Sequence, residues 1–454
     1  MTENVAAATS TRVGPAAVRQ LDRRLGLAAA AALGVLVSII LVFGLRRPLS
    51  VDEAALVDAI GGSFRDTVGA ALETNPAQTA TRAALYPLVA AGATDWVLRL
   101  PSLVAVLVAA ALVAHVGKVL SGRLAGITAG ALLGLAGVAG GITFDLRPHA
   151  LGLLAVALST MLFVSAMTRR SAAAWAMWAG VAALLPLVHP ACAAAVLAQA
   201  LAVTVSARHV PRLAIAATAF AATVAGLLLA AAALERSAAA GAGDESTGAF
   251  AVALARTVGW SPVALALACW GLVTLARKRA YWEATLLGGL AVGPIAAVAV
   301  AAAAFPTFPA SAAVLAAVGI ALAAGVGVAG IADSGRAAWL VAAAAAASLV
   351  AGVVVVLQPP PADWREATHW IEGQRGGSET VVVLPDRARA AYSRYAPGAR
   401  LWATGGGSGV WVVLRTPWAD ATTAARSVVS TPRYALLDER SFGPDLRVQH
   451  WIRP

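Results

Sequence analysis

Long apolar stretches separated by short polar connections make up most of the chain between residues 25 and 357. A helix needs about 20 mostly apolar residues to cross a membrane. Eleven runs come close to that length, so the pattern predicts a mainly α-helical membrane protein with about eleven transmembrane helices. The runs fall at 25–45, 100–120, 123–142, 148–168, 172–189, 190–207, 212–233, 250–276, 283–304, 308–331 and 337–357.

Basic residues are concentrated in alternate connections between these runs. Arg19, Arg23 and Arg24 precede the first run, and every second connection after it is basic. Connections rich in Lys and Arg stay on the cytoplasmic side of a membrane. The pattern therefore predicts a cytoplasmic N-terminus, an outer connection at 46–99 and an extracytoplasmic C-terminal segment. The basic connections contain Lys118 and Arg123, Arg169 and Arg170, Arg208 and Arg212, Arg277 to Arg279, and Arg336.

The long polar segments carry structural patterns of their own. Within 46–99, residues 51–72 have helical periodicity, which predicts an amphipathic helix along the membrane surface. The sequence QPPP ends the last apolar run, and alternating strand and helix patterns follow it. We therefore expect a disordered cytoplasmic N-terminus at 1–24, a transmembrane domain at 25–357 and an extracytoplasmic α/β domain at 358–454.

Composition agrees with a membrane protein. Of the 454 residues, 59% are hydrophobic and only 13% are charged, whereas soluble domains carry about 25% charged residues. The basic connections account for the net charge of +11, so this charge does not indicate nucleic-acid binding. Cys192 and Cys269 lie in apolar runs and have neither disulfide nor metal-site spacing. The bias towards Ala, Val, Arg and Gly is typical of a GC-rich bacterial genome, which indicates a bacterial plasma membrane.

Two adjacent carboxylates, Asp52 and Glu53, follow the first apolar run by a few residues. Adjacent side chains on a helix point about 100° apart, so the two acids need not bind one ligand. Ser50 and Glu53 also have the spacing of a capping box, which satisfies free N–H groups at a helix start. The sequence leaves open whether Glu53 is such a cap or part of a site.

A second polar group, Asp145, Arg147 and His149, lies between the third and fourth runs. Charged side chains at a membrane boundary are costly unless they are used. The arginine fork suits phosphate, and the start of the following helix adds partial positive charge. The alternative is an interfacial arginine beside a capping carboxylate.

Other polar residues at the ends of runs have structural explanations. His189 ends the fifth run, and a single histidine at a helix end is more often a hydrogen-bonding residue than a ligand. Arg99 and the tryptophans at run boundaries are expected to be interface anchors.

Taken in order, four stretches resemble the polytopic GT-C glycosyltransferases of the protein mannosyltransferase and aminoarabinose-transferase type. The resemblance is strongest over about residues 25–210, and the order of the stretches is its specific part. The start of the tail, Asp363-Trp364-Arg365, is similar to the outer domain of bacterial relatives. The four stretches are SVDEA, LYPL followed by LRLPS, GRLAGITAGALLGL, and DLRPHAL, which is similar to the Arg-Pro-Tyr-Ala-Leu stretch of the family.

The resemblance implies transfer of a sugar, mannose or arabinose, from a polyprenyl-phosphate donor to an extracytoplasmic glycolipid, polysaccharide or protein. Asp52 matches the catalytic carboxylate of the family and would act as general base. Arg147 would bind the donor phosphate. A divalent cation, Mg²⁺ or Mn²⁺, is an optional cofactor in the family. The other residues expected to bind substrate are Glu53, Glu73, Asp145, His149 and His189.

The chain departs from the family pattern in two places. His149 stands where the family has a tyrosine, and Glu73 is the only acid in a shortened segment before the second run. Two other classes of function therefore stay open. A transporter or lipid flippase predicts repeats and helices broken or charged near mid-membrane, whereas the runs have almost no charges in their middles. A non-catalytic cell-envelope assembly protein would use the tail to bind partners.

Overall fold

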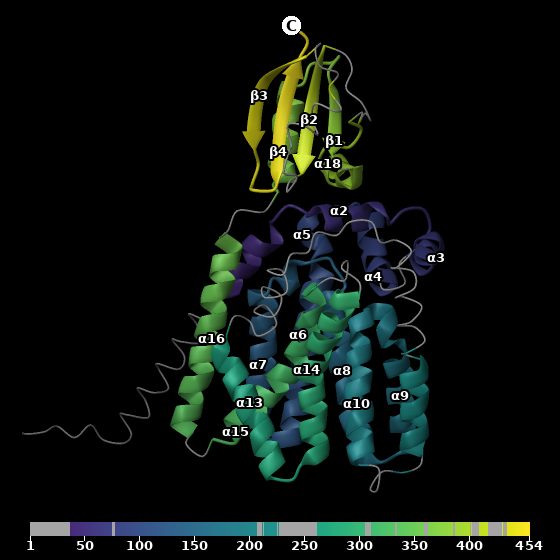
Figure 1. Cartoon of the computed structure of the whole chain (residues 1–454), viewed down its shortest axis with the longest axis vertical. Helices are drawn as coiled ribbons and strands as arrows, with labels where there is room; N and C mark the ends of the chain where they lie inside the picture. The colour runs from purple at the N-terminus through teal and green to yellow at the C-terminus, as the bar shows by residue number, and fades with distance from the viewer. Residues whose placement is uncertain are drawn as a thin grey trace, which may run out of the picture.

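The computed structural model describes residues 37–74, 78–206, 213–224, 261–304, 310–331, 334–357, 362–384, 386–399, 408–415 and 434–454, with four single residues between these ranges. This part is mainly helical, as predicted. A bundle of apolar helices carries a small α/β domain at one end, with short helices between the two (Figure 1). The segment expected to be disordered at 1–24 lies outside the described residues.

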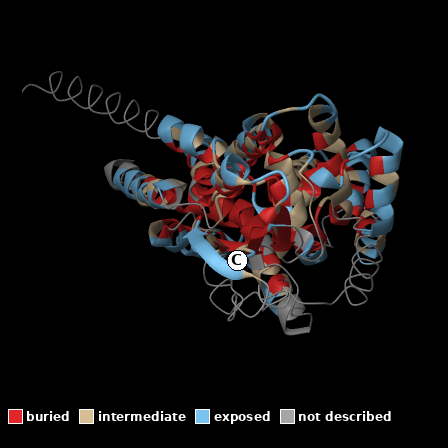
Figure 2. Ribbon diagram, turned by 90° about the horizontal axis from the view of Figure 1, so that it is seen from above, coloured by how far each residue is buried: buried red, intermediate tan, exposed pale blue. Residues whose placement is uncertain are grey.

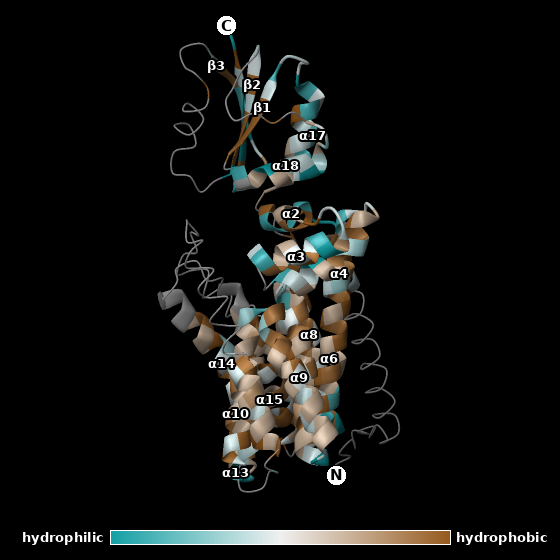
Figure 3. Cartoon of the chain, turned by 90° about the vertical axis from the view of Figure 1, so that its right-hand side faces the viewer, coloured by the Kyte–Doolittle hydropathy of each residue, from teal (hydrophilic) through white to brown (hydrophobic). Residues whose placement is uncertain are grey.

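The helices of the bundle are apolar over most of their length (Figure 3). Seen from the end that carries the domain, buried residues gather in the centre of the bundle and exposed ones around it (Figure 2). The helices are α6 (Leu100–Ser121), α7 (Arg123–Ala139), α8 (His149–Arg169), α9 (Ala172–Val188), α10 (Ala193–Val205), α13 (Pro262–Arg277), α14 (Tyr281–Ala304), α15 (Ala317–Ala329) and α16 (Ser334–Leu357).

Helix α15 is the centre of this bundle. Every residue from Ala317 to Val328 is buried, which is the pattern of a helix surrounded by other helices. Helix α13 approaches it closely because of two glycines. A Cβ atom on Gly271 would lie 1.9 Å from the Ala323 carbonyl oxygen, and one on Gly327 would lie 2.1 Å from that of Leu267. Small residues at such contacts let membrane helices pack backbone against backbone.

Three helices in the described residues are long and apolar enough to cross a membrane, namely Asp95–Ser121, His149–Arg169 and Tyr281–Ala299. Further apolar helices of 10–17 residues are present. Helices of this kind are consistent with membrane association, and the count of eleven spans stays a prediction. The shorter helices are Arg123–Val138, Ala172–Val188, Pro190–Val205, Leu213–Val224, Pro262–Arg277, Ala313–Ala329 and Trp339–Val354.

Short helices cover the end of the bundle that faces the α/β domain (Figure 1). The amphipathic helix predicted at 51–72 is divided in two, because Gly62 adopts a φ of +66° that side chains disfavour. The 3-10 turn Ile142–Phe144 leads towards α8. The short helices are α2 (Val51–Asp58), α3 (Phe64–Thr74), α4 (Thr79–Ala90) and α5 (Asp95–Leu98).

The C-terminal domain is a four-stranded sheet in the order β1-β2-β4-β3, with β1 parallel to β2 and the other pairs antiparallel. The alternation of strands and helices agrees with the sequence pattern. Its helices share one apolar core with the α2 segment, in which Leu49 and Leu56 join Trp364 and Tyr392. The elements are α17 (Trp364–Gln374), β1 (Thr380–Leu384), α18 (Arg389–Tyr395), β2 (Gly409–Arg415), β3 (Ala435–Ser441) and β4 (Leu446–Ile452).

Candidate functional site

A cavity of about 380 Å³ lies between the end of the bundle and the C-terminal domain. We call it the donor cavity, after the role that we propose for it. Its wall comes from the α2 segment, from the connection between α7 and α8, and from the C-terminal domain. Its charged lining residues are Arg47, Asp52, Glu53, Arg99, Asp145, Arg147, Arg415 and Asp445. The two groups of acids and bases found in the sequence therefore meet in one place.

A buried ion pair between Glu53 and Arg99 holds this wall together. The two side chains are 7% and 2% exposed, with Arg99 Nη2 lying 3.2 Å from Glu53 Oε2. The other oxygen, Oε1, accepts a hydrogen bond from the Leu146 N–H at 3.0 Å. Arg99 also donates to the carbonyl groups of Leu45 and Pro48 at 3.2 Å. The expected interface anchor is thus a buried brace that joins α2, α6 and the α7–α8 connection.

The start of α2 decides which way its two acids face. Ser50 and Glu53 form a complete capping box, as their spacing indicates: Glu53 N–H donates to Ser50 Oγ, and Ser50 N–H donates to Glu53 Oε2 at 2.8 Å. Burial raises the pKa of Glu53, while Arg99 and the two backbone N–H groups oppose this rise. With Glu53 turned inward, the adjacent Asp52 is exposed and lines the donor cavity.

Asp145 holds Arg147 in a fixed orientation. The Arg147 Nε group donates to both carboxylate oxygens, at 2.9 and 3.1 Å, and the Arg147 N–H donates to Oδ1 at 2.9 Å. Burial alone would raise the pKa of Asp145, but Arg147 and His149 hold it well below the usual range. Since the ion pair uses the Nε edge, both Nη groups of Arg147 stay available to an anion.

The negative charges around Arg147 raise its pKa, mainly through Asp145 and more weakly through Asp52 and Glu53. The Asp145 backbone carbonyl accepts a hydrogen bond from Ser102 Oγ at 2.7 Å, which ties this connection to α6. The arrangement combines a held guanidinium with a solvent-exposed carboxylate. These are the groups needed to bind a phosphate and to accept a proton from a hydroxyl.

The two candidate histidines lie next to each other, and one of them is close to Asp145. The His149 and His189 rings are 5.5 Å apart between centroids, and His149 Nδ1 lies 3.5 Å from Asp145 Oδ2. His189 Nδ1 accepts a hydrogen bond from the Ala191 N–H at 3.1 Å, so His189 starts the turn after α9. Neither histidine lines the donor cavity. His149 therefore supports Asp145 without lining the cavity, and His189 packs beside His149.

Glu73 is not part of this arrangement. It is exposed near the end of α3 and is not among the residues that line the donor cavity. The structure therefore brings together Asp52, Glu53, Asp145 and Arg147, with His149 next to them, and leaves Glu73 apart.

The C-terminal domain contributes lining residues, of which the sequence singled out Trp364 but neither Arg415 nor Asp445. Arg415 ends β2, Asp445 lies in the turn between β3 and β4, and Trp364 begins α17. No motif surrounds Arg415 or Asp445, so the only available signal was a charged residue at a strand end. The C-terminal domain thus completes the lining of the donor cavity, although Arg415 lies 268 residues beyond Arg147 along the chain.

The acidic and histidine side chains at this site are the candidate ligands for a divalent cation. Among the described residues, no group of three or more His, Cys, Asp or Glu side chains has the arrangement of a metal site. Glu53 and Asp145 are each held by an arginine, at 3.2 and 2.9 Å. Cationic neighbours compete with a metal ion for these carboxylates. Glu53 and Asp145 are thus poor ligands for Mg²⁺ or Mn²⁺, and a divalent cation at this site stays a prediction.

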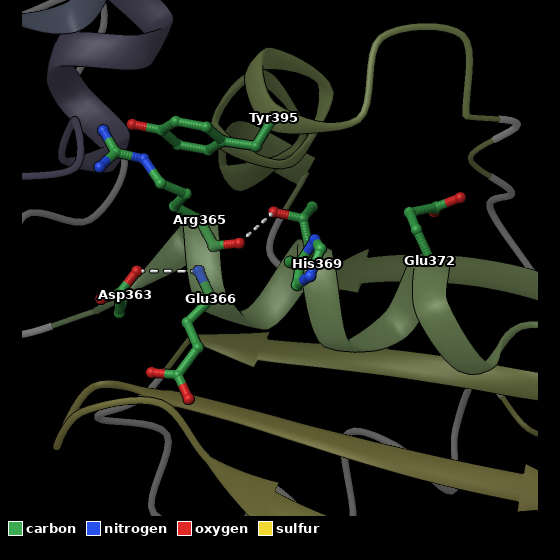
Figure 4. A pocket seen from close by; sticks show the side chains of 7 residues that line it. Asp363, Arg365, Glu366, His369, Glu372 and Tyr395 are labelled. Atoms are coloured by element: carbon green, nitrogen blue, oxygen red, sulfur yellow. Dashed lines mark hydrogen bonds between the residues drawn. The ribbon is translucent and has the colours of Figure 1, made fainter.

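A polar hollow of about 500 Å³ on α17 is a weaker candidate (Figure 4). Its carboxylates already have local partners. Asp363 caps α17 by accepting from the Glu366 N–H, Glu366 pairs with Arg440, and Glu372 accepts from the Tyr392 hydroxyl at 2.7 Å. These side chains stabilise the domain.

No protein-family model matches this chain, and a search of curated proteins finds no significant match.

Proposed function

We propose that the protein is a membrane glycosyltransferase of the GT-C type. It moves a sugar, mannose or arabinose, from a polyprenyl-phosphate donor to an extracytoplasmic glycolipid, polysaccharide or protein. One observation carries the proposal: an exposed carboxylate, Asp52, shares a cavity with Arg147, whose orientation is fixed by Asp145. This cavity lies at an end of an apolar bundle, where a lipid-linked donor can reach it from the membrane.

The proposed topology has eleven spans, with the shorter apolar helices crossing as well as the three long ones. Alternate basic connections support a cytoplasmic N-terminus and a C-terminal domain outside the bacterial plasma membrane. The donor cavity then opens at the outer surface.

In the proposed reaction, the acceptor hydroxyl attacks the anomeric carbon of the donor sugar. Asp52 takes the hydroxyl proton as the new carbon–oxygen bond forms. The bond between the anomeric carbon and the phosphate oxygen breaks, and its electron pair leaves on the polyprenyl phosphate. Attack from the face opposite the phosphate inverts the configuration at this carbon.

The arginines of the donor cavity stabilise the phosphate that leaves. Arg147 offers its two Nη groups, and Arg47 and Arg415 add positive charge from two other segments. A fork of N–H donors held before the reaction begins costs no reorganisation as charge develops. Glu53 keeps Asp52 turned to the cavity by occupying the buried position on α2.

The direct test is transfer of radiolabel from polyprenyl-phosphate sugars in membranes that contain the native chain, Asp52→Asn or Asp58→Asn. Asp58 is an exposed carboxylate on the same helix and does not line the donor cavity. Loss of a general base costs about 10²–10⁴-fold in rate. We therefore expect transfer to fall by at least about 100-fold in Asp52→Asn and to stay near native in Asp58→Asn.

Equal transfer by the native chain and Asp52→Asn would show that Asp52 is not the general base. A folded native chain that transfers no label from any donor would overturn the proposal in favour of a transporter or an assembly protein.

A further inference from the structure

A second polar cavity, of about 410 Å³, lies at the junction of the bundle and the C-terminal domain. We call it the junction cavity. It shares no lining residue with the donor cavity. Its volume is in the range of about 300–1,000 Å³ that small-molecule sites occupy. The mechanism proposed above does not use it.

The junction cavity lies at the level where the apolar helices end. Trp96, which lines it, is 50% exposed on α5, at the start of the long apolar stretch Asp95–Ser121. Leu45 and Arg46 also line it, at the end of a helix that is described from residue 37 to residue 45 and whose Phe43 is 55% exposed. Exposed tryptophans at the ends of apolar helices are typical of the layer of lipid headgroups.

The charge of the junction cavity is strongly positive. Three guanidinium groups, from Arg46, Arg365 and Arg394, line it with one carboxylate, that of Asp95. Asp95 Oδ2 accepts from Arg365 at 2.9 Å and from the Tyr395 hydroxyl at 2.7 Å, and Oδ1 accepts from Arg394 at 3.2 Å. Both oxygens of the single carboxylate therefore already accept hydrogen bonds. Three arginines and one aspartate leave the lining with a net charge of about +2.

Arg46 is the arginine best placed to meet a ligand. Its side chain is exposed, and its backbone carbonyl accepts a hydrogen bond from Arg365 at 3.4 Å. Arg365 has its guanidinium 5.5 Å from the centre of the Tyr395 ring, so an aromatic face holds it in position. Arginine forks held in this way match the oxygens of a phosphate group.

We propose that the junction cavity binds the phosphate headgroup of an anionic membrane lipid. The arginines contact the phosphate, and Trp96 lies beside the glycerol and the first part of the acyl chains. Because Arg365 and Arg394 belong to the C-terminal domain and Trp96 to the bundle, a bound lipid joins the two parts. This site is independent of the proposed sugar transfer.

The test is native mass spectrometry of the purified full chain, titrated with phosphatidylglycerol, phosphatidylcholine or soluble glycerol 3-phosphate. We expect one retained phosphatidylglycerol and no comparable retention of phosphatidylcholine. Arg46→Gln should weaken phosphatidylglycerol binding roughly tenfold, the effect of losing about 1.4 kcal/mol. Arg65→Gln is the matched control, since Arg65 is an exposed arginine on α3 that does not line the cavity.

Three outcomes would overturn the proposal. Equal retention of phosphatidylcholine would show an apolar site without phosphate recognition. Equal binding of glycerol 3-phosphate would show a site for a soluble phosphate. Equal weakening by Arg46→Gln and Arg65→Gln would show attraction to surface charge alone. Transfer activity is not the readout, so this proposal and the proposed function fail separately.

Discussion

Two neighbouring carboxylates on α2 have opposite surroundings, and this difference assigns their roles. Glu53 is buried against Arg99 and the Leu146 N–H, whereas Asp52 is exposed to the donor cavity. The capping box follows from the local sequence, because its members are three residues apart. The ion pair does not, because Arg99 is 46 residues further along the chain. Local spacing predicts the cap, and only the fold reveals the brace.

Replacing Glu53 by Gln should destabilise the protein strongly. The change leaves the Arg99 guanidinium, 2% exposed, buried without its carboxylate. Breaking a buried ion pair from one side costs about 3–5 kcal/mol. We expect a clear fall in the thermal unfolding midpoint of the purified protein, with Asp52→Asn close to native because Asp52 is exposed. A native midpoint together with lost transfer would instead make Glu53 a substrate-binding residue.

Close helix contacts in the bundle depend on glycines, which have no side chain between the two backbones. The apolar runs predict that helices exist, but their partners are set by small residues whose spacing is not visible in hydropathy. The α13–α15 contact is an example, since Gly271 and Gly327 each face a carbonyl group of the other helix. The break at Gly62 is also invisible in hydropathy. The helical period of apolar residues continues from 51 to 72, although Gly62 adopts a positive φ that glycine favours over other residues.

Gly271→Val should disrupt the α13–α15 contact. Its Cβ would lie 1.9 Å from the backbone oxygen of Ala323, and a backbone atom cannot rotate away. Overpacking costs typically about 1–3 kcal/mol and more where the backbone must move. We expect a lower unfolding midpoint and reduced yield in detergent. The control is Gly180→Val on α9, where an added Cβ meets nothing within 4 Å; an equal loss there would indicate a general cost of valine in these helices.

At the scale of the whole molecule, a polar cluster around Asp95 joins segments that are distant in sequence. Asp95, which begins α5, pairs with Arg365 and Arg394 of the C-terminal domain and accepts from Tyr395. The Tyr395 hydroxyl also accepts from the Leu49 N–H at 2.7 Å. The sequence predicts both the membrane part and the α/β part, but Asp95 and Arg365 are 270 residues apart. Because the sequence does not reveal this pairing, it predicts neither the contact between the two parts nor the position of Arg415 in the donor cavity.

Asp95→Asn should loosen the junction. The amide keeps the shape of the side chain but leaves two arginines without their counterion. If opening becomes easier by about 1.4 kcal/mol, cleavage of the transiently open form rises about tenfold. Limited proteolysis should therefore release the C-terminal domain faster. Asp438→Asn, on the exposed edge strand β3, is the control and should be cleaved at the native rate.

Arg415→Gln should reduce the affinity of the donor cavity for a lipid phosphate. A hydrogen bond to a charged group contributes about 1.5–3 kcal/mol, so KM for the donor should rise about tenfold or more with a smaller change in kcat. Arg453→Gln is the control, because Arg453 is exposed, does not line the donor cavity, and donates its backbone N–H to Ser408. Unchanged KM in Arg415→Gln would show that the domain covers the cavity without binding the donor.

The donor cavity also has an order of assembly. Its lining runs from Gly44 to Asp445, so it needs residues that are synthesised about 400 positions apart. A nascent chain can insert every helix of the bundle and still have no closed cavity, because β2 and the β3–β4 turn have yet to emerge. Whatever the cavity binds, the protein cannot bind it in this form until β2 and the β3–β4 turn have been synthesised and the C-terminal domain has folded.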